Sequence, residues 1–199
     1  MMNSMNLKQA LFAEREASFF RLRGGYSIPI AGAVWWAALG TAGYLLHSRH
    51  LWIFLAFVTS GMMFPLAMLL ARLLRNDFMR DRTAVSDLLF PAFTSMMLFW
   101  PIVISAWWAY PPLVPLILGI GMSIHWPVIG WTYGRTAIYT AHAVVRAIAC
   151  FVLWNWFPST RFTVLPFAVS AIYLATVAAI LIASSAGRKA RTQAGVPIG

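Results

Sequence analysis

The chain has 199 residues, of which 61% are hydrophobic and 10% are charged, and its mean hydropathy is +0.74. Soluble domains carry roughly 25% charged and about 45–50% apolar residues, so a soluble fold could not keep its surface polar with so few charges. The composition also excludes a disordered chain and a disulfide scaffold, because Cys150 is the only cysteine. The sequence therefore predicts an all-α polytopic membrane protein.

Six apolar segments are each long enough to cross the hydrocarbon core of a bilayer, which takes about 20 residues of helix. The first one begins only at residue 28 and has no small-residue cleavage site after it, so we interpret it as a retained span and not as a signal peptide. Short connections make three helical hairpins of the six spans. The predicted spans are 28–46, 51–71, 88–109, 113–131, 137–157 and 164–183.

The basic residues gather on one side of these spans. They lie before the first span, in the loops before the third and fifth spans and in the tail, whereas the other side holds Arg49 and Arg161. The positive-inside rule then places both termini in the cytoplasm. This topology accounts for the net charge of +10, and nothing besides charge supports nucleic-acid binding. We expect a cytoplasmic segment with an interfacial helix at 1–27, a transmembrane domain at 28–183 and a basic cytoplasmic tail at 184–199.

The tail beyond Gly187 is basic, and we expect it to be disordered. Prolines follow aromatic residues inside the second, third and fourth spans, at Pro65, Pro101 and Pro127, and predict a kink or break at each position. Aromatic residues also collect at the outer ends of the spans, where amphipathic rings anchor a protein in the headgroup layer. These predicted anchors are Tyr44, Trp52, Trp107, Trp108, Tyr110, Trp154 and Trp156.

One charged residue, Arg146, lies inside a span. It is nine residues beyond position 137 and so about 13 Å into the membrane, where inserting an arginine costs on the order of 2.5–3.5 kcal/mol. Arg135, Tyr139 and His142 precede it at intervals that place all four residues on one helical face. His125 on the preceding span lies at a similar depth, and the rotation of the two helices decides whether it faces His142. We therefore predict a cationic, histidine-lined pocket in the inner half of the bilayer.

The partner of Arg146 is left open by the sequence, because all five acidic residues lie outside the spans. A backbone carbonyl freed by a proline, a lipid phosphate or an anionic ligand would each serve. The same absence argues against a proton- or sodium-coupled transporter that relays cations through carboxylates. Two histidines without a third ligand make a poor zinc site, so we expect no metal and no cofactor. Hydrogen bonding inside the bundle is the simpler role for both histidines.

The stretch from Ser123 to Tyr133, which reads SIHWPVIGWTY, is the most distinctive motif. Together with GMMFPLA at 61–67 and FWP at 99–101, it resembles a family of uncharacterised bacterial multi-pass membrane proteins that carries a similar histidine–aromatic–proline stretch ending in Trp-x-Tyr. The resemblance covers residues 20–185 and implies a six-span fold in the bacterial inner membrane, with no assigned activity. It marks the signature positions His125, Trp126, Pro127, Trp131 and Tyr133.

Transport or passage of a small anionic or amphiphilic solute is the function that the sequence favours. The predicted ligand-binding residues are Arg146, His142, His125, Tyr139, Arg135, Trp126 and Tyr133. One alternative is a membrane-embedded enzyme that acts on a lipid, with His125 or His142 as general base. A second alternative is a non-catalytic assembly subunit, since small residues at intervals of four on the last span let helices approach closely. That stripe, which would serve in a homo-oligomer or in packing within the monomer, comprises Ala171, Ala175, Ala179 and Ala183.

Overall fold

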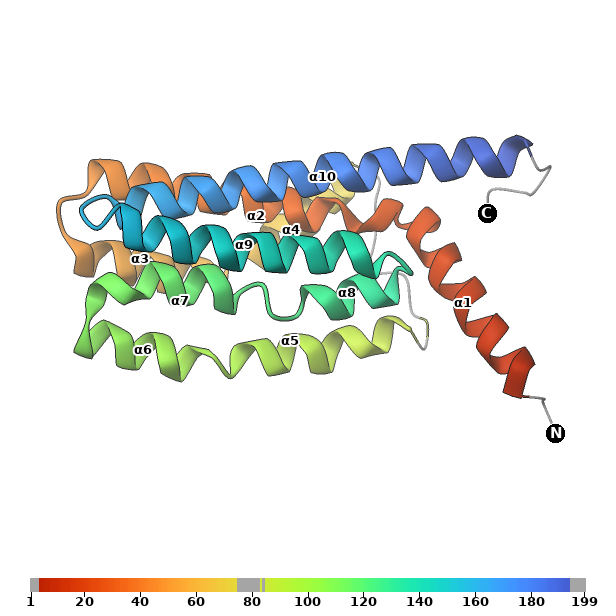
Figure 1. The fold of residues 1–199 in the computed structure, drawn as a ribbon, viewed down its shortest axis with the longest axis horizontal. Helices are drawn as coiled ribbons and strands as arrows, with labels where there is room; N and C mark the ends of the chain where they lie inside the picture. Colours follow the sequence, from red (N-terminus) through yellow and green to blue (C-terminus); the bar gives the residue numbers. More distant parts are fainter. Residues whose placement is uncertain (1–3, 75–82, 84, 194–199) are drawn as a thin grey trace.

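The computed structural model describes residues 4–74, 83 and 85–193. Every regular element in these ranges is a helix, which confirms the all-α prediction. The helices lie side by side in an elongated bundle (Figure 1). The first helix, α1 (Ser4–Arg21), and the last turns of α10 (Arg161–Gln193) project from the same end of the bundle, which we call the α1 end.

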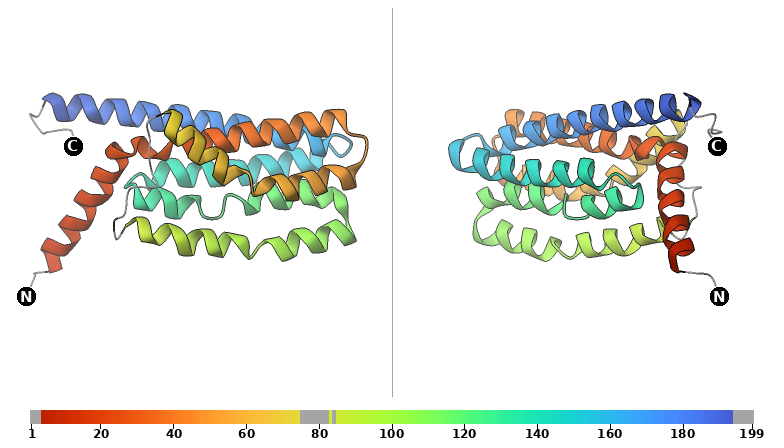
Figure 2. Two further views of the ribbon diagram at one scale, coloured as in Figure 1. Left: turned by 180° about the vertical axis from the view of Figure 1, so that it is seen from behind. Right: turned by 45° about the vertical axis from the view of Figure 1, so that its right-hand side comes forward.

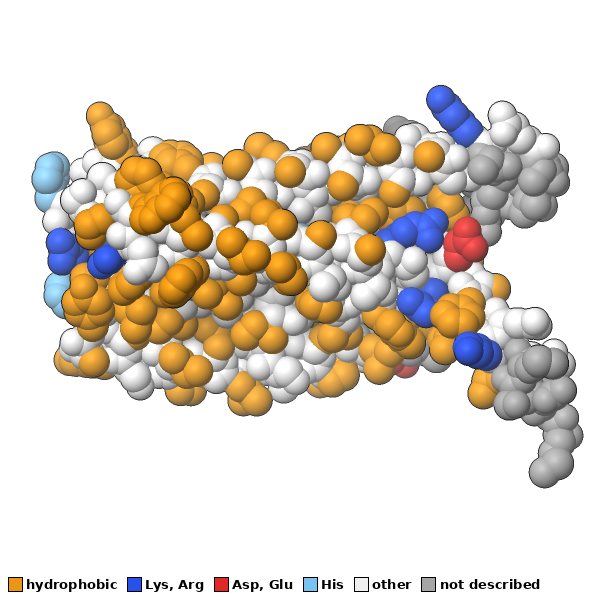
Figure 3. All heavy atoms as spheres, in the orientation of Figure 1, with side chains coloured by type: hydrophobic (Ala, Val, Ile, Leu, Met, Phe, Trp, Pro, Cys, Tyr) orange, Lys and Arg blue, Asp and Glu red, His pale blue; other side chains and the backbone are white. Residues whose placement is uncertain are grey.

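The helices have the length and composition that a bilayer requires. Five of the described helices are long and apolar enough to cross a membrane, and the bent pair α3–α4, if counted as one span, makes a sixth candidate. Figure 3 shows hydrophobic side chains along the whole length of one face, with charged side chains and histidines toward the two ends of the bundle. The chain is therefore a membrane protein, as its composition predicts.

Three of the predicted spans are broken helices. The pair α3 and α4 is bent by 51° at the break between them. Pro101 and Pro127 each lie in the first turn of the helix that follows a break, where a missing backbone N–H costs nothing. The predicted proline breaks are thus confirmed. The pairs are α3 (Arg49–Ser60) with α4 (Met63–Leu73), α5 (Leu89–Met97) with α6 (Trp100–Ala109), and α7 (Val114–Gly121) with α8 (Trp126–Thr132).

Helices α2 (Ser27–Leu45), α9 (Thr136–Trp156) and α10 form the densest part of the bundle. Glycines on α2 make the close approach to α10 possible: a Cβ added at Gly32 would lie 2.7 Å from the Tyr173 ring, and one added at Gly43 would lie 2.0 Å from the Phe162 carbonyl oxygen. The two helices are therefore in near backbone contact at the end opposite to α1.

Two predictions from sequence are wrong in detail. Trp52 is not an interfacial anchor, because its side chain is buried and its indole N–H donates to the Leu39 carbonyl at 2.8 Å. The segment after Gly187 is helical as far as Gln193, because α10 continues through it and Gly187 packs against the Phe20 ring of α1's last turn. Residues 194–199 of the tail, and Arg75, Arg80 and Arg82 of the predicted basic loop, lie outside the described residues.

Candidate functional site

The polar face predicted on α9 exists in the structure. Tyr139, His142, Arg146 and Cys150 are the buried residues of this helix, and Arg135 at its N-terminal boundary is half-buried. Their intervals of three and four residues place them in one row. The row points into the bundle, toward α2, α8 and α10.

Arg146 is completely buried at the centre of this row, with an exposed fraction of 0%. Its guanidinium carbon lies 5.0 Å from the centre of the Trp36 ring and 5.1 Å from that of Tyr173. Its Nη1 donates to the Tyr173 hydroxyl at 2.8 Å. Two cation–π contacts return about 0.5–2 kcal/mol each, whereas removing a charge from water costs several kcal/mol. The aromatic enclosure therefore offsets only part of the cost of burying this cation.

His142 is held in one tautomer by its neighbour on α10. Its Nδ1 lies 2.7 Å from Oγ1 of Thr176, and that hydroxyl donates its single hydrogen to the Ile172 carbonyl at 2.8 Å. The hydroxyl must accept from the imidazole, so Nδ1 carries the hydrogen. In the neutral ring Nε2 is then an acceptor, and it has no hydrogen-bond partner within the described part of the chain.

Trp126 connects the two histidines. Its ring stacks on the His142 ring, with the two ring centroids 4.1 Å apart. The centroid of the His125 ring lies 6.2 Å from that of Trp126. The His125 ring also packs against Phe93, with centroids 5.0 Å apart. The structure thus gathers all three residues, and Trp126 contacts both imidazoles. The arrangement depends on the break before α8, because in a continuous helix His125 and Trp126 would point in a different direction about the helix axis.

The remaining predicted residues brace the α1 end. The Tyr139 hydroxyl donates to the carbonyl of Gly24, and a Cβ added at Gly25 would lie 2.7 Å from the Tyr133 hydroxyl. Arg135 stacks over the Phe19 ring at 4.7 Å. Both glycines have positive φ, 63° and 60°, a conformation that other residues rarely adopt. These contacts hold the turn between α1 and α2 against α8 and α9.

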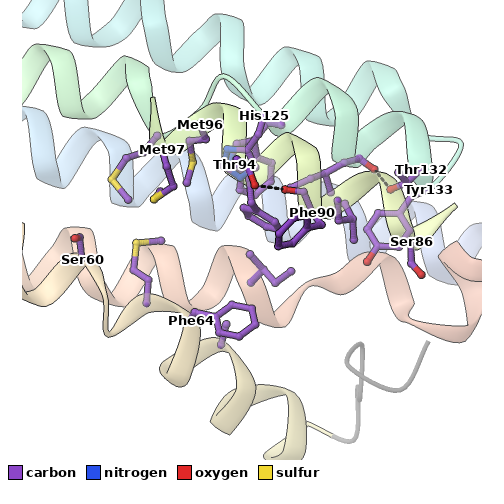
Figure 4. A pocket seen from close by; sticks show the side chains of 18 of the residues that line it. Ser60, Phe64, Ser86, Phe90, Thr94, Met96, Met97, His125, Thr132 and Tyr133 are labelled. Atoms are coloured by element: carbon purple, nitrogen blue, oxygen red, sulfur yellow. Dashed lines mark hydrogen bonds between the residues drawn. The ribbon is translucent and has the colours of Figure 1, made fainter. Parts of the chain in front are cut away.

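A pocket of about 560 Å³ lies between the bent helix α4 and helix α5. Figure 4 shows Phe64 of α4 on one wall and the side chains of α5, with His125, on the other. His125, Trp126, Tyr133 and Tyr173 line it, whereas Arg146, His142, Tyr139 and Arg135 do not. The remaining lining is mostly apolar and rich in methionine: Met63, Met96, Met97 and Met122, with Ser60, Ser86, Thr94 and Thr132 as hydroxyl groups.

The predicted site is therefore divided into two adjoining parts. One is the pocket, which ends against Trp126 and Tyr173. The other is the core around Arg146, which these two rings cover and which we call the Arg146 cluster: Trp36, Trp126, His142, Arg146 and Tyr173.

Unsatisfied polar atoms concentrate in the Arg146 cluster. Four N–H groups have no hydrogen-bond partner in the described ranges, namely Nε and Nη2 of Arg146 and the indole nitrogens of Trp36 and Trp126. Nε2 of His142 and Nδ1 of His125 are equally unpartnered there. Buried polar groups in native proteins almost always find partners, so this concentration makes the cluster a candidate binding site.

Sequence reasoning missed the walls that α2 and α10 supply. Trp36 and Tyr173 are neutral aromatics in apolar helices, and nothing singles out either one in isolation. A signal was present on α10, because Ser170, Tyr173, Thr176 and Ser184 recur at helical spacing and all four are buried. Such a polar row inside an apolar helix indicates an inward face.

The described residues contain no group of three His, Cys, Asp or Glu side chains that could hold a metal ion. The chemistry that remains is that of a donor-rich cationic core beside a methionine-lined apolar pocket. This chemistry would suit a ligand with acceptor groups and an apolar chain.

The fold and the site together define a polytopic α-helical membrane protein with a polar core between its helices. By comparison with known families, the chain belongs to a family of unknown function, DUF7010, which it matches over residues 13–183. The resemblance to an uncharacterised family is thereby confirmed. No curated protein and no solved structure matches the chain.

Proposed function

We propose that the protein binds an amphiphilic solute in the pocket between α4 and α5 and passes it between the bilayer and the cytoplasm. The single observation that carries this proposal is the pocket itself. Its volume of about 560 Å³ lies within the range of about 300–1,000 Å³ that small-molecule sites occupy. Methionine side chains adapt to irregular apolar ligands, which suits a flexible chain.

The bend in the second span gives this pocket lateral access. Figure 2 shows α4 turning away from the line of α3 while α5 continues alongside α8. The 51° bend separates α4 from α5, and the pocket between them is partly open. A molecule with an apolar chain can enter from the lipid without crossing the polar ends of the bundle.

The polar end of the solute would meet His125. Its Nδ1 is buried and unpartnered among the described residues, and the His125 side chain lies beside Thr94 on the wall of the pocket that faces Phe64 (Figure 4). An unpaired buried nitrogen gains a full hydrogen bond when a ligand supplies the complementary group. This preference favours an amphiphile over a pure hydrocarbon.

The orientation of the protein in the membrane decides between which compartments the solute would pass. The distribution of basic residues supports six spans with both termini in the cytoplasm of a bacterial inner membrane. The α1 end is then cytoplasmic, and the pocket lies in the cytoplasmic half of the bilayer because its lining reaches Ser18 and Tyr133 at that end. Solute would exchange between the inner leaflet and the cytoplasm.

A cross-linking experiment with a matched control tests the pocket. The purified protein in nanodiscs is irradiated with dodecanoic acid that carries a diazirine, and the labelled peptides are mapped. We expect labelling on α4, α5 and α8. Ala67→Phe and Thr94→Trp fill the pocket and should abolish it, whereas Ala171→Phe, on an exposed position of α10, should not. Equal labelling of all four proteins would refute the proposal.

A lipid-modifying enzyme is the second candidate, because His125 faces a pocket that also presents hydroxyl groups and imidazole is the usual general base. Turnover of a lipid headgroup in proteoliposomes, lost in His125→Gln, would establish it over passage of an unchanged solute. The assembly role would use the alanine stripe, of which Ala171 and Ala175 are exposed and Ala179 and Ala183 half-buried. Copurification of a stoichiometric companion would favour that role.

A further inference from the structure

We propose that the Arg146 cluster is a binding site for a compact monovalent anion, separate from the amphiphile pocket. The anion is either a free halide or the carboxylate of an amphiphile whose chain lies in the pocket. The halide form is independent of the proposed function, whereas the carboxylate form rests on it.

The charge of Arg146 is the first argument. Arg146 has an exposed fraction of 0%. Its guanidinium forms no ion pair in the described part of the chain, where the ion pair that occurs joins Arg21 to Glu14. Glu14, Glu16 and Asp87 lie outside the spans, and Asp77 and Asp81 lie outside the described residues. The Tyr173 hydroxyl and the two ring faces are neutral groups. A neutral partner can accept a hydrogen bond, but it leaves the buried charge uncompensated.

The chemistry of the unpartnered atoms is the second argument. Both free nitrogens of Arg146 and the indole nitrogens of Trp36 and Trp126 are obligate donors. The cluster therefore has a surplus of N–H groups and one positive charge: Trp36 contacts Arg146 directly, and Trp126 packs on Tyr173, which accepts from Arg146. Their common complement is an acceptor that carries negative charge and has no hydrogen to donate, which describes a halide or a carboxylate.

The position of the cluster supplies an entry route. Trp126 and Tyr173 form part of the pocket lining on one side, and on the other side they pack against His142 and Arg146. Trp126 and Tyr173 therefore lie between the pocket and the rest of the cluster, and an anion would pass from the pocket to Arg146 beside these two rings.

His142 adds no donor to the cluster. With its hydrogen on Nδ1 and directed at Thr176, the neutral ring presents a lone pair at Nε2, which an anion avoids. The donors available to an anion are therefore those of Arg146 and the two indoles.

The test uses the full-length protein in detergent and measures thermal unfolding by the reactivity of Cys150, the only cysteine and a buried one. Chloride is compared with gluconate at constant ionic strength, and decanoate is compared with decanol. Stabilisation by chloride supports a free anion. Stabilisation by decanoate but not by decanol supports a carboxylate from the pocket. The absence of stabilisation by either anion overturns the proposal.

Four variants locate the effect. Arg146→Met should abolish the anion dependence, and Trp36→Phe should weaken the apparent affinity roughly tenfold by removing one N–H donor. Arg161→Met is the control for a buried arginine, since Arg161 already donates to the Trp154 carbonyl at 2.7 Å. Trp35→Phe is the control for an indole, since Trp35 donates to Thr59 at 2.9 Å. Anion dependence that survives in Arg146→Met and Trp36→Phe, or that is lost equally in the controls, overturns the proposal.

If Arg146→Met fails to fold, two other measurements test the anion site. Trp36→Phe keeps the cation, and equilibrium binding of radioactive chloride to the wild-type protein needs no variant. Saturable binding of one chloride per chain supports the site, and no saturable binding of chloride or decanoate refutes it. Ala67→Phe fills the pocket without touching the cluster, so it should remove the decanoate effect and leave the chloride effect. Failure of the amphiphile proposal is thereby separated from failure of this one.

Discussion

Gly32→Ala tests the link between the α2–α10 approach and the buried arginine. The added Cβ would lie 2.7 Å from Cε1 and Cζ of Tyr173, where ordinary contacts are 3.4–4 Å. The ring must therefore move by roughly 0.7 Å or more to reach a normal contact. Its hydroxyl accepts the 2.8 Å hydrogen bond from Arg146, and that bond would be stretched beyond normal hydrogen-bond length.

The expected cost follows from two unfavourable terms and one favourable term. Overpacking costs about 1–3 kcal/mol, and a weakened hydrogen bond to a charged group costs up to about 1.5–3 kcal/mol. Replacing a helical glycine with alanine returns about 0.5–1 kcal/mol. The free energy of unfolding should fall by about 2–3 kcal/mol, which for a chain of this length lowers Tm by about 4–12 °C.

The assay relies on the single buried thiol of Cys150, which reacts with a fluorogenic maleimide when the protein unfolds. Gly61→Ala is the control, because the space around Gly61 is open, with the Val58 carbonyl oxygen at 3.9 Å from the added Cβ. In a double-mutant cycle with Tyr173→Phe, the two effects should be less than additive, since both weaken the same hydrogen bond. Full additivity, or a neutral Gly32→Ala, would refute the reasoning.

Three further predictions concern packing and topology. Gly43→Ala should lower Tm more than Gly32→Ala, because its Cβ would meet the Phe162 backbone at 2.0 Å; a Tm equal to that of Gly61→Ala contradicts this. Trp52→Phe removes the hydrogen bond to the Leu39 carbonyl and should cost about 1 kcal/mol in the same thiol assay; an unchanged melting curve contradicts it. In a Cys150→Ala background, Ser48→Cys and Ser159→Cys should react with an impermeant maleimide added outside intact cells, and Glu16→Cys only after lysis; the reverse pattern would invert the topology.

Periodicity predicted the inward face of α9 because that face consists of polar residues in an otherwise apolar helix. Because Tyr139, His142 and Arg146 lie on one side of α9, the helix can be rotated about its axis in one way only, with this polar row facing the inside of the bundle. The proline breaks were predictable for a similar reason, since the loss of a backbone donor is a local property of the sequence.

The geometry of the pocket was not predictable from residue periodicity and proline positions. Pro65 indicates that a helix breaks, but the angle of 51° between α3 and α4 cannot be derived from a proline alone. The sequence suggested that His125 and His142 lie near each other, and both rings pack against Trp126. The insertion of the Trp126 ring against His142 depends on the irregular turn before α8, and no periodicity describes such a turn.

Trp52 shows where a statistical preference fails. Tryptophan near a span end is usually an interfacial anchor, and Trp108, with 84% of its surface exposed, is free to act as one. Trp52 instead faces Leu39 of α2, whose carbonyl accepts its indole hydrogen. Which face of the helix points inward decides between the two outcomes.

The dependence of Arg146 on Tyr173 has a consequence for biogenesis. Helix α9 enters the bilayer with a charge at its centre, at a cost on the order of 2.5–3.5 kcal/mol, and the hydroxyl that accepts from this charge belongs to α10, 27 residues later in the chain. Thr176, which orients His142, also lies on α10. Helix α9 thus depends on α10 for a stable position in lipid, and the two are expected to leave the insertion machinery as one hairpin.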